Sequence, residues 1–331
     1  MKRFLLCFGI IICWAVNAAA QQWIRYDGGT GAGRGKHIVL ISGDEEYRSE
    51  EAMPMLAKIL SQRFGFTCTV LFAIDNATGC IDPTVLNNIP GLHHLSSAHL
   101  MILFTRFREL PDDQMKYIDD YLQSGKPVIG IRTATHAFNY KSRSSSKYAR
   151  YSFRSTIKDW ENGFGAKVLG DTWVAHHGIH GKEGTRALVN GIEQRAGNPL
   201  LNGVKNIWVP SDVYTVEQMY NTPARVLLYG QCTSGMDSSA PVNLQKSIMP
   251  VAWTKNYSIR KGVTGKVFAT TMGSSVDFLN EDLRRLLINA CFWALDIDIP
   301  EKADVTIIGD YQPTMFGFNK FVKGTRPADK Q

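Results

Sequence analysis

The chain has 331 residues, of which 44% are hydrophobic, 11% aromatic and 20% charged. This is the composition of a globular protein with a large buried core, and it excludes a disordered, fibrous or low-complexity chain. The formal charge of +7 is modest and no basic stripe accompanies it, so nucleic acid is not an expected partner.

Residues 1–20 have the pattern of a secretory signal peptide. Lys2 and Arg3 precede an apolar run, and the stretch ends in small residues up to Ala20. The apolar run is shorter than the roughly 20 residues that span a bilayer, which argues against the alternative of an uncleaved anchor. We therefore expect cleavage before Gln21, a secreted or periplasmic location and no membrane span after cleavage.

Cleavage would leave four cysteines, Cys68, Cys80, Cys232 and Cys291. Four cysteines scattered over so long a chain do not make a disulfide scaffold, although an oxidising compartment leaves their disulfide status open. Cys68 lies in an apolar strand-like run and Cys291 in a helical pattern, which favours buried free thiols at both positions.

The first half of the mature chain predicts alternating strands and helices. Residues 21–36 are rich in glycine and are expected to form a flexible leader. Short apolar runs then predict strands over 37–42, 68–72, 99–105 and 127–132. Amphipathic spacing predicts helices over 52–64, with Pro54 in the first turn, and over 112–124, ended by Gly125.

The second half is less regular at first. Residues 141–221 open with KSRSSSKYARY, which predicts a basic surface loop or a lid. Strands are predicted again over 225–229, 250–254 and 266–271, followed by a helix that Asn280 caps. We expect an α/β domain over residues 37–300 with a doubly wound, mostly parallel sheet, and a C-terminal surface tail over 301–331.

Polar side chains follow three of the predicted strands, where parallel strands place their carboxyl ends at one edge of the sheet. Three carboxylates, Asp44 to Glu46, could supply an acid or base, and of these Asp44 and Glu45 are the catalytic candidates together with His136. Other groups at these strand ends could bind substrate: Tyr47, Arg48, Arg106, Arg132 and Thr133. The alternative is a cluster of caps and salt bridges at the sheet edge.

Three of the eight histidines lie within residues 176–180. His176 and His180 have a spacing that zinc sites use, although Gly178 and Gly181 favour a loop over a helix. A zinc-like divalent metal on these two residues, a metal-free polar site that includes His177 as a catalytic group, and a purely structural loop all remain open. No HExxH motif is present, so the sequence gives little support to a metalloprotease.

Several motifs carry a resemblance to a known family: GDEEYRSEEAMPMLAKIL from residue 43, GIRTATHAF from 130, LGDTWVAHHGIHGKEGTR from 169 and GKVFATTMGSSVDFLNEDL from 265. In collinear order over about residues 37–310 they resemble the ThuA-like (trehalose-utilisation) family, and more narrowly its exported branch. The resemblance implies a flavodoxin-like, three-layer fold of the class I glutamine amidotransferase type. It also implies a role in carbohydrate metabolism, including pathways with keto-sugar intermediates.

The resemblance does not extend to amidotransferase chemistry. In those enzymes a Cys nucleophile sits in the turn that here reads from Gly130 to His136, and this turn contains neither Cys nor Ser. Thr133 is therefore expected to bind substrate rather than to attack it. Many ThuA-like chains carry a Gly-His pair where this chain has Gly273 and Ser274, so a histidine role there does not carry over.

Two functions follow as hypotheses. The first is a hydrolase or lyase-like enzyme for a disaccharide or keto-sugar derivative, in which Trp173, Trp253 and Tyr47 stack on the sugar and arginines hold its hydroxyls or an oxyanion. The second is a non-catalytic carbohydrate-binding or accessory module on the same fold. In both, the partner is a small-molecule carbohydrate, no cofactor is assigned beyond the zinc-like metal left open above, and homo-oligomerisation stays open.

Overall fold

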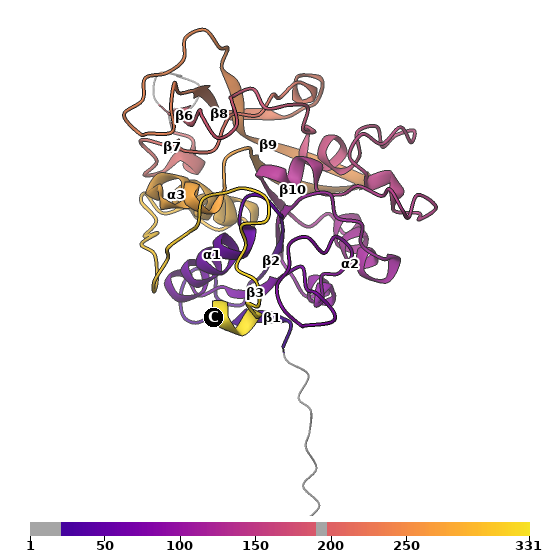
Figure 1. Ribbon diagram of the computed structural model, residues 1–331. Helices are drawn as coiled ribbons and strands as arrows, with labels where there is room; N and C mark the ends of the chain where they lie inside the picture. The colour runs from indigo at the N-terminus through magenta and orange to yellow at the C-terminus, as the bar shows by residue number, and fades with distance from the viewer. Residues whose placement is uncertain (1–20, 190–196) are drawn as a thin grey trace, which may run out of the picture.

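The computed structural model describes residues 21–189 and 197–331, so the expected signal peptide lies outside the described residues. A ten-stranded sheet crosses the molecule in the spatial order β1-β3-β2-β4-β5-β10-β9-β8-β6-β7 (Figure 1). In chain order its strands are Trp23–Tyr26, His37–Gly43, Thr67–Leu71, Leu100–Thr105, Val128–Ile131, Thr185–Leu188, Trp208–Val209, Arg225–Cys232, Met249–Arg260 and Val263–Thr270.

The sheet is mixed, with a parallel core. Strands β3, β2, β4, β5 and β10 are parallel neighbours, and every other neighbouring pair is antiparallel. The expectation of a mostly parallel sheet therefore holds for this core and not for the half formed by β9, β8, β6 and β7. The two strands predicted over 250–254 and 266–271 are parts of one longer hairpin, β9 and β10, which turns at Gly262 with φ of 79°.

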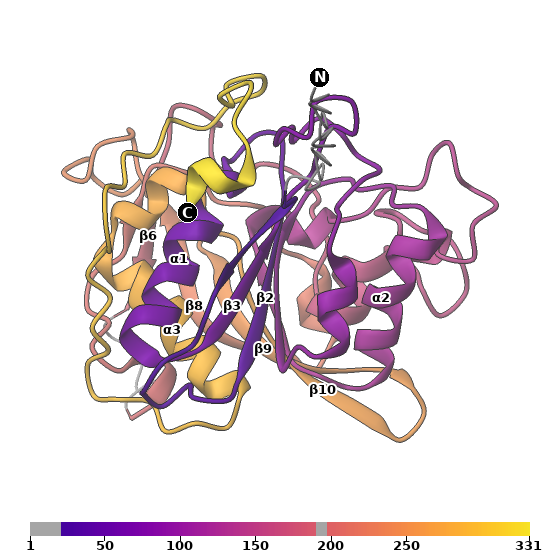
Figure 2. The ribbon, with the colours of Figure 1, turned by 90° about the horizontal axis from the view of Figure 1, so that it is seen from below.

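Helices cover both faces of the sheet (Figure 2). Helices α1 (Ser49–Phe64) and α3 (Glu281–Ala294) pack on one face, and α2 (Asp112–Gln123) packs on the other. All seven residues of β2 are buried, as expected for a strand covered on both sides. Asn280 caps α3 as predicted, accepting from the Leu283 amide at 2.9 Å. Helix α1 begins earlier than predicted, so Pro54 lies in its second turn and not in its first.

The expected flexible leader is wrong for residues 23–26. These residues form β1, which pairs antiparallel with β3 from Trp23 opposite Leu71 to Tyr26 opposite Cys68. Ile24 and Tyr26 are buried while Arg25 is exposed, the period-2 pattern of an edge strand. Gly31 then passes close to the end of α1, where a Cβ would come within 2.5 Å of the Phe64 carbonyl oxygen.

Residues 301–331 run over the surface and are fixed there at many points. Arg284 donates to the carbonyl of Val305 at 2.9 Å, and the amide of Gly317 donates to the carbonyl of Glu46 at 2.7 Å. The tail, yellow in Figures 1 and 2, thereby passes the helices α3 and α1 and reaches the turn after β2. The chain ends in a 3₁₀ turn, η9 (Pro327–Lys330), beside β1.

All four cysteines in the described ranges are free thiols, with Cys68 and Cys291 buried as predicted. Burial raises the pKa of both thiols. Among the helices that the structure describes, none combines the length and apolar character needed to cross a membrane.

A second group of histidines lies at the opposite ends of the parallel strands. His37 packs near His94, and its amide donates to the His99 ring at 3.1 Å. Burial, assisted by the charge of Arg25 and by these two histidines, lowers the pKa of His37 to about 4.

We therefore expect stability to fall on acidification. The folded state holds His37 neutral, so its stabilisation is complete above the ordinary pKa of about 6.5 and is lost as the pH falls toward 4. The loss should be about 2 kcal/mol, because one pKa unit corresponds to about 1.4 kcal/mol and solvent screens part of the shift. Urea titrations between pH 7 and 4 measure this, and His37→Gln should flatten the pH dependence; an equally steep dependence in that variant would contradict the assignment.

Candidate active site

The turn after β2 is organised by Asp44, whose side chain is fully buried. One of its oxygens accepts from the amides of Glu46, at 2.8 Å, and Tyr47. The other accepts from the Thr133 hydroxyl at 2.5 Å, which ties this turn to the one after β5. Both oxygens are thus used by the protein itself, so Asp44 acts as a positioning residue for the turn.

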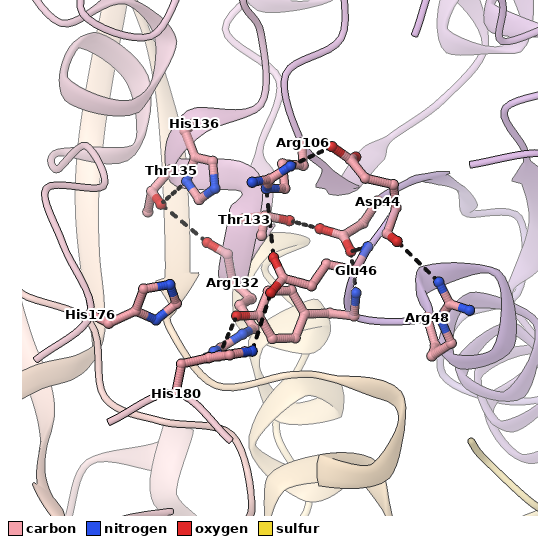
Figure 3. Close-up of polar contacts among 12 residues, drawn as sticks. Asp44, Glu46, Arg48, Arg106, Arg132, Thr133, Thr135, His136, His176 and His180 are labelled. Carbon is pink, nitrogen blue, oxygen red and sulfur yellow. Dashed lines mark hydrogen bonds and ion pairs between the residues drawn. The ribbon is translucent and has the colours of Figure 1, made fainter. Parts of the chain in front are cut away.

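Glu45 is also held in ion pairs. Its carboxylate binds Arg106 and, at 2.7 Å, the fully buried Arg108. Arg48, expected to bind substrate, is itself buried and donates to the carbonyl of Glu45 at 3.1 Å. It lies apart from the histidines in Figure 3. The capping and salt-bridge interpretation therefore describes Asp44, Glu45 and Arg48 well.

Arg132 begins the turn after β5 in a left-handed conformation, with φ of 45°. Its guanidinium is fully buried between the rings of Tyr47 and Tyr214, at 4.0 and 4.3 Å from their centroids. It donates to the carboxylate of Asp212 at 2.9 Å and to the carbonyl of Thr271 at 2.7 Å. Because no part of it is exposed, Arg132 supports the site from the protein interior and does not present its charge to a substrate.

Asp212 joins two of the predicted histidines. One of its oxygens lies 2.6 Å from Nδ1 of His176, and the other lies 3.1 Å from Nδ1 of His180. Burial opposes ionisation of this carboxyl, but the hydrogen bonds from both histidines and the charge of Arg132 hold its pKa below the usual range. The two imidazoles are about one-third exposed, so Asp212 fixes two solvent-facing rings from a buried position.

Glu46 completes this group on the other side of His180 (Figure 3). Its Oε1 lies 3.3 Å from Nε2 of His180, and its Oε2 lies 3.8 Å from Nε of Arg106. Burial and the neighbouring Asp44 raise the pKa of Glu46. The group formed by Glu46, His176, His180 and Asp212 is called the carboxylate–histidine cluster below.

His136 lies beside this cluster among aromatic rings. Its ring centroid is 5.0 Å from that of Phe107, 5.3 Å from Trp173 and 6.2 Å from Tyr214. Burial lowers the pKa of His136 well below its ordinary value, and the charges of Arg106 and Arg132 add to this. The imidazole is therefore neutral, and Trp173, also 5.7 Å from the His176 ring, connects it to the cluster.

Two predicted site residues lie elsewhere. Trp253 is fully buried in β9 and donates from its indole nitrogen to the carbonyl of Leu169 at 2.8 Å. The prediction that Trp253 stacks on a sugar is therefore wrong, because its ring lies in the sheet interior with no exposed surface. His177 turns its Nε2 to the carbonyl of Ser247 at 2.9 Å, and no contact among the described residues joins its ring to His176 or His180.

Asp212 and two aromatic residues of the tail were not predicted from the sequence, and Glu46 was not singled out among the three carboxylates after β2. Asp212 follows β7, a strand of only two residues whose short pattern gives no strand signal. Phe316 packs against the rings of Tyr47 and His180, at 5.4 and 5.3 Å, and Phe318 lies over the guanidinium of Arg106. No local sequence pattern predicts these tail contacts, because their partners lie more than 100 residues away in the sequence.

His176, His180 and Asp212 could also hold a metal ion. Each offers one ligand atom, and these atoms all lie within 4.8 Å of one another. Imidazole nitrogens with one carboxylate oxygen are a donor set that suits zinc and similar ions. The geometry is thus compatible with the divalent metal that the spacing of the two histidines suggested.

The fold and site define an α/β protein with a carboxylate–histidine cluster at the carboxyl ends of a parallel sheet core. The model of the ThuA family, described as trehalose utilisation, matches residues 38–294, and the chain belongs to this family. A search of curated proteins finds no match.

Similar solved structures include two ThuA-like proteins. One, from Parabacteroides merdae, is 14% identical, with 86% of this chain and 97% of that chain covered and a TM-score of 0.48. The other, from Bacteroides uniformis, is also 14% identical, with 82% and 96% covered and a TM-score of 0.46. The N-terminal domain of mmIFT52 is similar at 14% identity and a TM-score of 0.41, with 80% of this chain and 99% of that chain covered.

Proposed function

We propose that this protein is an enzyme of carbohydrate metabolism that acts by proton transfer, as a hydrolase or lyase, on a disaccharide or keto-sugar derivative. The observation that carries the proposal is the buried carboxylate of Asp212 bound to two exposed imidazoles. An orienting carboxylate behind a solvent-facing histidine is the arrangement that acid–base catalysis requires. Family membership supplies the substrate class, since the family model is described as trehalose utilisation.

The two histidines suit different roles. A carboxylate cannot donate, so Nδ1 of His176 carries the proton in its bond to Asp212, and Nε2 is left with a lone pair that can accept a proton from the substrate. Both nitrogens of His180 face a carboxylate oxygen, of Asp212 and of Glu46. His180 and Glu46 therefore share a proton that can be returned to a leaving group.

Arg106 can supply the electrostatic part of the reaction. Its side chain is 20% exposed, whereas Arg108 and Arg132 are fully buried. Its N–H groups that are not bound to Glu45 can donate to a sugar hydroxyl or to a developing oxyanion. Of the arginines predicted to bind substrate, Arg106 is the one whose position fits that role.

The test is turnover of trehalose and of its 3-keto form by the purified chain from residue 21 onward, with products followed by mass spectrometry. We expect one of the two to be consumed. Folded protein that turns over no glycoside or keto-glycoside would overturn the proposal. Saturable sugar binding without turnover would instead support the accessory-module hypothesis, which the internal engagement of Asp44 and Glu45 favours.

A metal ion would change how the cluster works, and its presence can be measured directly. If His176, His180 and Asp212 hold a zinc-like ion, the ion supplies Lewis-acid polarisation of a carbonyl or activation of water. His176→Ala and His180→Ala should then lower metal content from about one ion per chain to near zero, with activity lost in parallel. Activity lost while the wild type itself contains no metal would assign both histidines to proton transfer alone.

We also infer that the protein belongs to the exported branch of the family and has the flavodoxin-like, three-layer arrangement of class I glutamine amidotransferases. The apolar run and small residues of 1–20 support the first inference, and helices on both faces of the parallel core support the second. Expression in a Gram-negative host should release the chain to the periplasm with Gln21 as its first residue. N-terminal sequencing checks this, and a retained Met1 on soluble cytoplasmic protein would contradict it.

A further inference from the structure

The tail segment 314–318 crosses the edge of the candidate site and is fixed there from both sides. Thr314 donates from its amide and hydroxyl to the carboxylate of Glu51 at 2.9 and 2.8 Å, and its carbonyl accepts from Ser275 at 3.0 Å. The Gly317 amide donates to the carbonyl of Glu46, a member of the carboxylate–histidine cluster. The segment therefore has a defined position relative to the catalytic groups.

Gly317 lets the two flanking phenylalanines point in different directions. Its φ of 145° lies in a region that residues with a Cβ rarely adopt, and an added Cβ would come within 3.0 Å of Lys320. Phe316, on one side, is 4% exposed and packs on Tyr47 and His180. Phe318, on the other, is 51% exposed.

Phe318 continues a surface of rings that starts at the histidines. The Arg106 guanidinium lies 5.0 Å from the Phe318 centroid and 4.5 Å from that of Phe107, so it is in contact with both rings. Phe107 in turn lies next to His136. The partly exposed guanidinium of Arg106 and the exposed phenyl ring of Phe318 thus stand side by side at the rim of the site.

We propose that segment 314–318 forms one wall of the sugar-binding site and that Phe318 stacks on a sugar ring whose hydroxyls Arg106 binds. The inference rests on the proposed function for its ligand class. A sugar has an apolar C–H face and polar edges, so an exposed aromatic ring beside a donor with free N–H groups matches both. If Phe318 served only to cover Arg106, ligand binding would not depend on it.

The experiment compares Phe318→Ala with Phe318→Tyr, which keeps the aromatic face, and with Val322→Ala. Val322 is a matched control because it belongs to the same tail and is 58% exposed. Calorimetry measures Kd for trehalose and its 3-keto form, and initial rates give KM and kcat. We expect Phe318→Ala to raise Kd and KM about fivefold to tenfold, with kcat within about twofold, Phe318→Tyr to restore both, and Val322→Ala to match the wild type.

The outcomes separate this inference from the proposed function. Unchanged Kd and KM in Phe318→Ala overturn the inference and leave the enzymatic proposal standing. Weaker binding in Phe318→Ala, with no turnover by the wild type, supports the sugar wall and overturns the enzymatic proposal. Folded wild-type protein that binds neither sugar overturns both.

Discussion

Replacing Asp212 by Asn should lower kcat about 100-fold or more while leaving substrate binding largely intact. The carboxylate accepts from Nδ1 of both His176 and His180, and an amide cannot accept from both on its two sides. At least one imidazole would then take the other tautomer or turn away, and the lone pair needed for proton transfer would be lost. General acid–base catalysis typically contributes a factor of 10²–10⁴, which sets the expected scale.

This variant also disturbs a buried charge, so its stability must be measured alongside its activity. Arg132 would lose its charged partner in the interior, at a cost of about 3 kcal/mol. Asp119→Asn is a matched control, because Asp119 is a buried carboxylate of α2 that pairs with Arg150 and Tyr151. It should destabilise the fold without lowering kcat. His176→Gln and His180→Gln alter partly exposed rings and test the same role with less risk to folding; full activity in all three site variants would refute it.

Replacing Asp277 by Asn should lower the free energy of unfolding by about 3 kcal/mol or more. The fully buried Asp277 accepts five hydrogen bonds from three residues: from the Ser211 amide and hydroxyl, the Gly273 amide, and the Ser274 amide and hydroxyl. Every one of these neighbours donates to it. An Asn amide nitrogen on either side would face donors and leave buried groups unpaired.

Urea unfolding followed by circular dichroism measures this loss. Asp310→Asn is the control, because Asp310 is exposed and its side chain contacts Gln312 alone among the hydrogen bonds described. Its effect should stay within about 0.5 kcal/mol. Equal unfolding midpoints for the two variants would show that the turn after β10 does not depend on the charge of Asp277.

The same turn depends on the conformations of Gly273 and Ser274. Ser274 caps the following 3₁₀ turn through Asp277. Gly273 has a φ of 135°, and a Cβ there would come within 2.4 Å of Ile131. Gly273 and Ser274 therefore have structural roles in this chain.

The sequence predicted the parallel core well because buried strands and amphipathic helices have local signals. Apolar runs predicted β2 to β5, and Gly125 after α2 and Asn280 before α3 gave signals that each lie within about ten residues. Strand β1 was not predicted, because a run of four residues followed by many glycines carries little hydrophobic periodicity. The antiparallel pairing of β9, β8, β6 and β7 was not predicted, because hydrophobic periodicity does not encode the direction in which a strand pairs.

The candidate site was predictable only in part, for a related reason. The strand-end rule brought Glu46, Arg106 and His136 together from three turns, and histidine density identified His176 and His180. Which groups would be exposed was not predictable, because the buried pairs of Arg108 and Arg132 depend on partners from distant segments. Asp212 and Phe318 belong to irregular stretches whose place is set by tertiary contacts alone.

The two edges of the sheet affect how copies of this chain can associate. An edge strand with free amide and carbonyl groups is a template for pairing with another chain, and proteins blunt such edges with short strands or covering segments. β7, at one end, is two residues long, and β1, at the other, lies against η9, where the Tyr26 hydroxyl donates to the carbonyl of Lys330 (Figure 1). Continuation of the sheet from one molecule into the next is therefore disfavoured at both edges, and self-association, where it occurs, would use side-chain surfaces instead.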